Sequence, residues 1–141
     1  MSVYNLIAAT SFVLQIIVLM MLFGSLLLKG KRKFREHGIT MLVAVVLHTI
    51  SIVAVMVPSF GVITSGGFSA SISAITYVHG ITGIIAEVFG VWIVVSWRLR
   101  TSLQYCAPKK NLMRITLISW LIALLLGVLV YLHFYTALLP L

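Results

Sequence analysis

Four long runs of apolar residues alternate with short polar segments along the chain. The runs cover residues 3–28, 39–57, 74–97 and 112–137. Crossing about 30 Å of hydrocarbon takes about 20 apolar residues in a helix, because a backbone in lipid has to satisfy its own hydrogen bonds. The pattern therefore predicts four transmembrane helices.

The segments between these runs are short, so neighbouring spans are expected to be antiparallel. No stretch is left for a soluble domain, and residues 1–141 are predicted to form a single domain. No basic residues precede the first run, which favours a retained span over a signal peptide. The predicted fold class is an all-α integral membrane protein, an antiparallel bundle of four transmembrane helices.

Charge predicts how the bundle is oriented. The ten Lys and Arg residues form two clusters, from Lys29 to Arg35 and from Arg98 to Arg114. Short loops rich in these residues stay in the cytoplasm. Loops 29–38 and 98–111 are therefore predicted to be cytoplasmic, and an outer loop over 58–73 and both termini to lie outside, in a plasma-membrane protein.

The net charge of +8 does not point to nucleic acid here, because the basic residues lie at the membrane surface, where they meet anionic lipid. The expected partners are the lipid bilayer and other membrane subunits of a larger complex.

Ionisable residues inside the spans are the first place to look for function, because hydrocarbon solvates them poorly. At 1.5 Å rise per residue, His48 and Glu87 both lie near the bilayer midplane and are predicted to form a buried polar pair. His79 lies about 9 Å outward of the centre of its span, and His133 about 12 Å. His37 is assigned to the solvated basic loop.

A haem b in a helix bundle needs two axial ligands at similar depth, often both histidine. His79 and His133 have similar depths; His48 and His79 would meet only if helix tilt closed a gap of about 9 Å. These three histidines are the candidate haem or metal ligands. The structural alternatives are a register-fixing pair for His48, an interfacial contact for His133 and either role for His79.

The sequence offers no nucleophile with an adjacent base and no HExxH zinc motif, so no catalytic residue is predicted and an enzyme is not expected. Three hypotheses stay open. The first is a non-catalytic accessory subunit or assembly factor of a respiratory or other haem or copper redox complex. The second is an electron carrier that binds haem b through His79 and a second histidine. The third is a proton or ion pathway through His48 and Glu87.

Several short motifs resemble a known family. They are Arg35-Glu36-His37-Gly38-Ile39-Thr40-Met41, Tyr77-Val78-His79, Val88-Phe89-Gly90, and Trp120 followed by Gly127-Val128-Leu129-Val130-Tyr131 and Tyr135. With these motifs the chain from about Leu28 onward resembles the four-span family known as domain of unknown function four-twenty. The histidines also give it a looser similarity to four-helix haem b subunits.

The family resemblance implies a small prokaryotic membrane protein. One branch of the family is linked to maturation of cytochrome c oxidase. His37 and His79 match positions where the family carries histidine, whereas His48 and His133 do not. Where members often have a His-Arg-Lys run before the last span, this chain has Pro108-Lys109-Lys110-Asn111.

Overall fold

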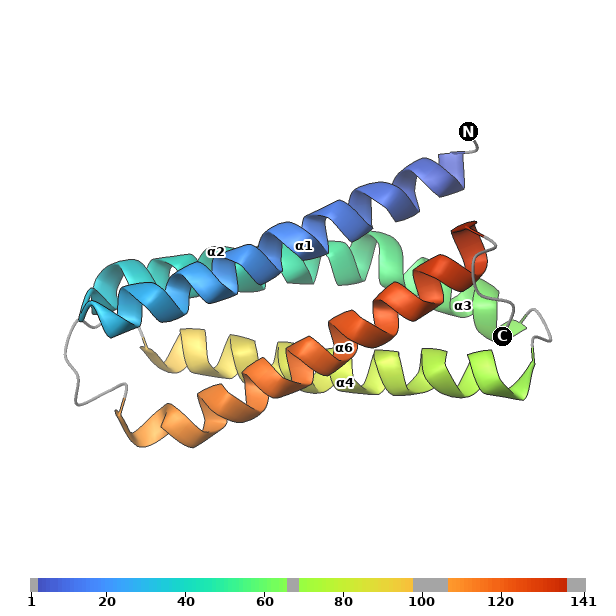
Figure 1. The fold of residues 1–141 in the computed structure, drawn as a ribbon. Coiled ribbons are helices and arrows are strands. Elements are labelled where there is room, and N and C mark those ends of the chain that lie inside the picture. The colour runs from blue at the N-terminus through green and yellow to red at the C-terminus, as the bar shows by residue number, and fades with distance from the viewer. Residues whose placement is uncertain (1–2, 66–68, 98–106, 137–141) are drawn as a thin grey trace.

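The protein is an all-α bundle in the computed structural model, which describes residues 3–65, 69–97 and 107–136. The main helices are α1 (Val3–Gly30), α2 (Phe34–Ser51), α3 (Val57–Ser65), α4 (Ala70–Trp97) and α6 (Lys110–Thr136). A π-helical turn, η1 (Ile52–Met56), joins α2 to α3, and a 3-10 turn, η2 (Ala107–Lys109), precedes α6. Figure 1 shows the helices side by side along one long axis.

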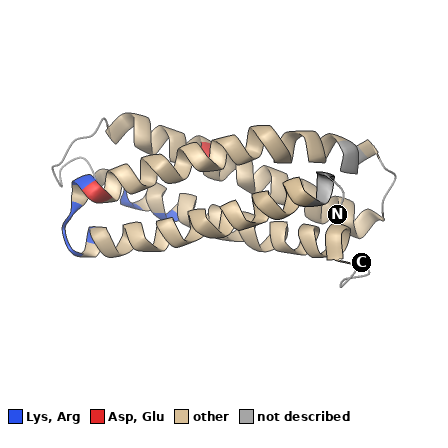
Figure 2. Cartoon of the chain, turned by 90° about the horizontal axis from the view of Figure 1, so that it is seen from above, with Lys and Arg blue, Asp and Glu red and all other residues tan. Residues whose placement is uncertain are grey.

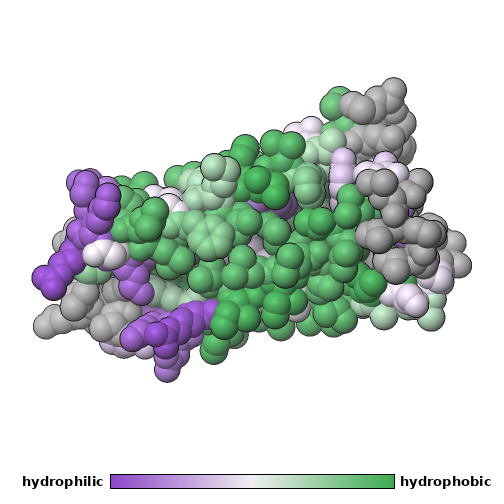
Figure 3. Space-filling view, in the orientation of Figure 1, coloured by the Kyte–Doolittle hydropathy of each residue, from purple (hydrophilic) through white to green (hydrophobic). Residues whose placement is uncertain are grey.

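Four segments are long and apolar enough to cross a membrane: Leu6–Gly30, Phe34–Gly61, Ala70–Trp97 and Lys110–Thr136. Large apolar side chains lie exposed along all of them, for example Met20, Val53, Val95 and Leu125. Figure 3 shows this apolar surface as a broad band between the ends of the bundle. Such a surface is stable only against lipid or other membrane proteins, so the predicted four-span, multi-pass membrane fold is confirmed.

The core forms where the four spans meet. It contains residues from every span: Val18, Leu22, Ala44, Val45, Ala86 and Trp120. Small residues let helix backbones approach closely in lipid. The indole of Trp97 lies directly over Gly38, where a Cβ would be 2.1 Å from the ring. Any side chain at this glycine would therefore require the indole of Trp97 to shift.

The second span is longer than predicted. An outer loop was expected over 58–73, but helix continues to Ser65 and α4 begins at Ala70, while residues 66–68 lie outside the described part of the chain. Pro58 has no N–H to donate and its ring clashes with a carbonyl one turn earlier in a regular α-helix. The π turn just before it, in which Val57 donates to Ile52 five residues back, accommodates the proline without ending the helix.

The first basic loop is shorter than predicted. Instead of spanning 29–38, the turn between α1 and α2 is only residues 31–33. Arg32 adopts a left-handed conformation with φ of 59°, and Lys33 donates to the carbonyl of Leu28 while Arg32 donates to that of Lys29. This is a Schellman-type helix end, which reverses the chain within a few residues. Most of the second basic loop, residues 98–106, lies outside the described residues.

The described Lys and Arg residues gather at one end of the bundle, and the two termini lie at the other (Figure 2). The predicted orientation assumes that the basic residues lie together at one end of the bundle, and the described Lys and Arg residues do so.

Thiol labelling tests that orientation. With the native Cys106 replaced by serine, Lys31→Cys and Ser69→Cys place single exposed thiols at opposite ends of the bundle. A membrane-impermeant maleimide added to intact cells is expected to label Ser69→Cys at once and Lys31→Cys only after permeabilisation. Labelling of Lys31→Cys in intact cells would contradict the predicted orientation.

Candidate functional site

A polar cluster joins α2 to α4 in the middle of the bundle. The Nδ1 atom of His48 lies 2.7 Å from Oε2 of Glu87, and the Thr49 hydroxyl donates to the other carboxylate oxygen, Oε1. His48 is buried, and the Glu87 side chain is 16% exposed. The structure therefore brings together the two residues whose depth in the spans suggested a pair. The carboxylate accepts from both neighbours, which orients the imidazole with Nδ1–H toward Glu87 and leaves Nε2 without a proton in the neutral ring.

Trp120 of α6 completes the surroundings of His48. The two rings meet edge to face, with centroids 4.9 Å apart and an interplanar angle of 70°. The indole is 3% exposed and packs near Gly90, where an added Cβ would lie 4.0 Å from the ring. Three of the four spans thus hold one imidazole in place at mid-depth.

His79 is held by α6 rather than by another side chain. Its Nδ1 lies 2.8 Å from the carbonyl oxygen of Ala123. A carbonyl only accepts hydrogen bonds, so Nδ1 carries the proton and Nε2 of the neutral ring keeps a free electron pair. The ring reaches this carbonyl because Gly127 has no side chain: a Cβ there would be 2.9 Å from Cε1 of His79.

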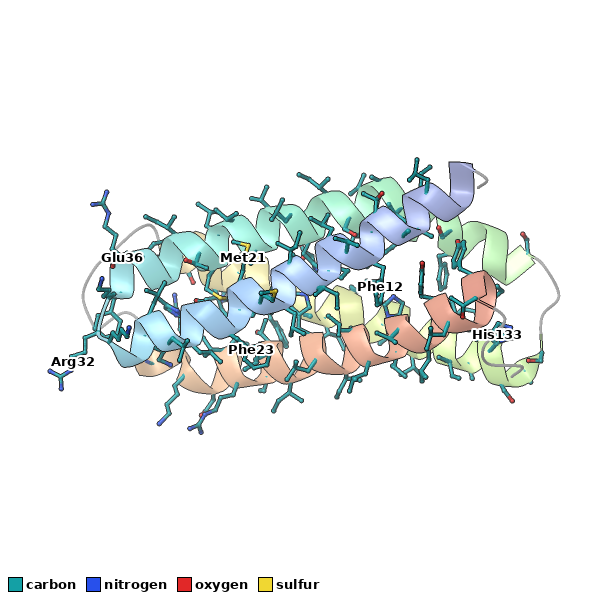
Figure 4. The ribbon with its side chains drawn as sticks, turned by 45° about the horizontal axis from the view of Figure 1, so that its top comes forward. Phe12, Met21, Phe23, Arg32, Glu36 and His133 are labelled. Atoms are coloured by element: carbon teal, nitrogen blue, oxygen red, sulfur yellow. The ribbon has the colours of Figure 1, made fainter. Side chains whose placement is uncertain are left out.

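An intramembrane cavity of about 350 Å³ lies beside these groups. His48, His79, Gln15 and Trp120 line it, together with apolar and aromatic residues of all four spans. An aromatic column of Phe12, Tyr131 and Tyr135 forms part of the wall, in which Tyr131 stacks 4.7 Å from Phe12 and 5.4 Å from Tyr135. In Figure 4, Phe12 reaches from α1 into the space between the helices.

Two residues that line this cavity carry a buried N–H donor without a partner among the described residues: Gln15 on α1, through Nε2, and Trp120 on α6, through Nε1. Other polar groups nearby are satisfied, such as the Ser11 and Ser51 hydroxyls, which lie 2.9 Å apart and link α1 to α2. Because most buried polar groups in proteins find a partner, these two unpaired donors are unusual among the described residues.

His37 is not in a solvated loop, contrary to the prediction. It is buried in the first turns of α2, with Nδ1 2.8 Å from the carbonyl of Ser25 and 2.6 Å from its hydroxyl. The basic run before it suggested a loop, but the tight turn at 31–33 brings this residue back against α1. His37 therefore joins the C-terminal end of α1 to the N-terminal end of α2.

The three candidate ligands separate into two groups. His48 and His79 line the same cavity, whereas His133 does not. The two lie at different depths, as the sequence suggested, because His48 contacts Glu87, which is eight residues or about 12 Å of helix from His79 along α4. His133 contacts Phe134 edge to face and lies near the C-terminal end of α6, at the other end of the bundle from Arg32 and Glu36 (Figure 4). His79 is level with Ala123 and Gly127, and the six residues from Gly127 to His133 span about 9 Å of helix.

Sequence reasoning missed several members of the site. Gln15 was visible as the one amide deep in a span, but its open donor depends on how α1 packs. Thr49 is the next residue after His48, and this position alone does not predict that its hydroxyl donates to the same carboxylate, that of Glu87. The described residues contain no group of three or more His, Cys, Asp or Glu side chains that could hold a metal ion.

Comparison with protein families, with curated proteins and with solved structures finds no match to this chain.

Adding a single methyl group at Gly127 tests its close contact with His79. Gly127→Ala is expected to displace the imidazole, break its bond to Ala123 and lower the free energy of unfolding by about 1–3 kcal/mol, as overpacking does. Unfolding in mixed micelles measures this.

Gly83→Ala is the matched control, since Gly83 lines the same cavity but an added Cβ there would have no neighbour within 4 Å. Its stability is expected to be unchanged or slightly higher, because alanine favours the helix. Equal stability of the two variants would refute the close contact.

Proposed function

We propose that the protein is a non-catalytic accessory subunit or assembly factor of a membrane redox complex of the haem or copper type. The observation that carries the proposal is the pair of histidines on one intramembrane cavity. His48 and His79 come from different spans, and each has Nδ1 directed at an acceptor. Imidazoles oriented in this way through Nδ1 are the form in which histidine binds metals and haem iron through Nε2.

The resemblance described above supports the same proposal. The motifs around His37 and His79 resemble a four-span family with a branch linked to oxidase maturation. The proposal also accounts for the extensive apolar surface of the spans, which offers room for partner subunits as well as lipid.

A second candidate function is electron transfer through haem b held by His79 and a second histidine. The cavity favours His48 as the second ligand over His133, because His48 and His79 both line it. Imidazoles with free Nε2 atoms are the ligand type that haem iron takes, and bound haem would supply one-electron chemistry.

Purification from native membranes tests the leading proposal. An affinity-tagged chain, solubilised in a mild detergent, is expected to elute with a larger complex that contains haem or copper. Recovery of the chain as a lone species would contradict the proposal.

Two histidine variants sharpen this test. His79→Ala is expected to lower the haem or copper content of the associated complex, because it removes the electron pair that α6 orients. His133→Ala is the control and is expected to leave that content unchanged, since His133 does not line the cavity. An absorption spectrum of the purified chain tests the second candidate function. A Soret band that is lost in His79→Ala supports haem binding. A wild-type chain without a Soret band after haem-replete expression excludes haem binding.

A further inference from the structure

We propose that the 350 Å³ cavity is a binding site for a lipid-soluble quinone or quinol. This inference goes beyond the proposed function, because it rests on the chemistry of the cavity wall and not on membership of a redox complex.

The unpaired donors indicate what kind of ligand fits. Nε2 of Gln15 and Nε1 of Trp120 are buried N–H groups without an acceptor among the described residues, and Trp120 is only 3% exposed. They lie on different helices, α1 and α6, and both residues line the same cavity. Buried donors are costly to leave unpaired, so the missing partner is a molecule that carries acceptor oxygens.

His79 adds a hydrogen-bond acceptor. Because its Nδ1–H is donated to the Ala123 carbonyl, Nε2 is an acceptor. The residues of the wall thus include two with unpaired donors, Gln15 and Trp120, and two with an acceptor Nε2, His79 and His48. Carbonyl oxygens of a quinone accept from the donors, and a hydroxyl of the corresponding quinol can in addition donate to the imidazole.

Other occupants match this wall less well. A haem iron or a metal ion takes electron pairs from histidine but gives nothing to the N–H groups of Gln15 and Trp120. An acyl chain has neither donors nor acceptors. A quinone ring combines acceptor oxygens with a flat apolar body, as an otherwise apolar pocket requires.

The aromatic residues of the wall also suit a planar ring. Phe12, Tyr131 and Tyr135 offer stacked aromatic surface on one wall. On another wall lies the π turn η1, whose residues Ile52, Val55 and Met56 all line the cavity. Single π-helical turns occur frequently at functional sites, and a volume of 350 Å³ falls in the range of small-molecule sites.

The test uses the full chain in nanodiscs of quinone-free lipid and radiolabelled decyl-benzoquinone as the probe. Saturable binding is expected for the wild type. Gln15→Leu and Trp120→Phe each remove one N–H donor and are expected to weaken binding about tenfold, the loss of roughly one hydrogen bond. Thr10→Val is the matched control on α1: the Thr10 hydroxyl is exposed and bonds to its own helix at Leu6, so binding is expected to be unchanged.

Thermal unfolding without quinone adds a second readout. Gln15→Leu replaces an unpaired donor with an apolar group, so this variant is expected to be at least as stable as the wild type while it binds the probe more weakly. A structural role for Gln15 would lower the stability. Reduced stability of Gln15→Leu, or wild-type affinity in both donor variants, would overturn the proposal.

Two further outcomes would also overturn it. Decylbenzene, which has the ring and tail but no oxygens, should not compete; equal affinity would mean that the cavity accepts any apolar ring. A Soret band in the purified chain would mean that haem takes this space. Isolation of the chain as a lone species that binds quinone would contradict only the proposed function, and loss of quinone binding in a chain that still elutes with a redox complex would contradict only this inference.

Discussion

Inside the bilayer no water is available, so each polar group of the spans needs a partner within the protein or its ligand. This constraint explains most of the polar contacts in the bundle. Glu87 takes hydrogen bonds from His48 and Thr49, Ser11 pairs with Ser51, and Ser25 meets His37. Each of these contacts joins two helices, so satisfying the polar groups also sets how the spans pack.

Close packing decides which of these contacts are possible. Gly38 leaves room for the indole of Trp97, and Gly127 leaves room for the imidazole of His79. In both places a glycine on one span accepts a large ring from another. The same packing leaves unpaired donors on Gln15 and Trp120, two residues that line one cavity, and we therefore assign that cavity a ligand.

Much of the fold could be predicted from the sequence, because hydrophobic length and charge placement act on the chain locally. The four spans follow from these properties alone. The limits of the second span could not be predicted in this way. Pro58 suggested that the helix ends, but the π turn at Ile52–Met56 lets it continue. The basic run suggested a longer loop, but the tight turn at Arg32 shortens it. Those two local conformations depend on contacts that a hydropathy pattern does not contain.

The site was predictable only in part. Helix rise placed His48 level with Glu87, and the structure has them in contact. Helix rise also separated His79 from His48 in depth, but it could not show what His79 contacts, because helix rotation depends on packing. Its position beside Ala123 depends on the absence of a side chain at Gly127, and its partner is a backbone carbonyl that no motif reveals.

The central claim is that the two unpaired donors meet a bound ligand. A crystal structure of the protein purified with its native lipids tests this claim most directly. The account predicts planar density in the cavity with an acceptor atom within hydrogen-bonding distance of Nε2 of Gln15 and Nε1 of Trp120. A cavity closed by repacked side chains, or both donors bonded to protein atoms or to water alone, would contradict it.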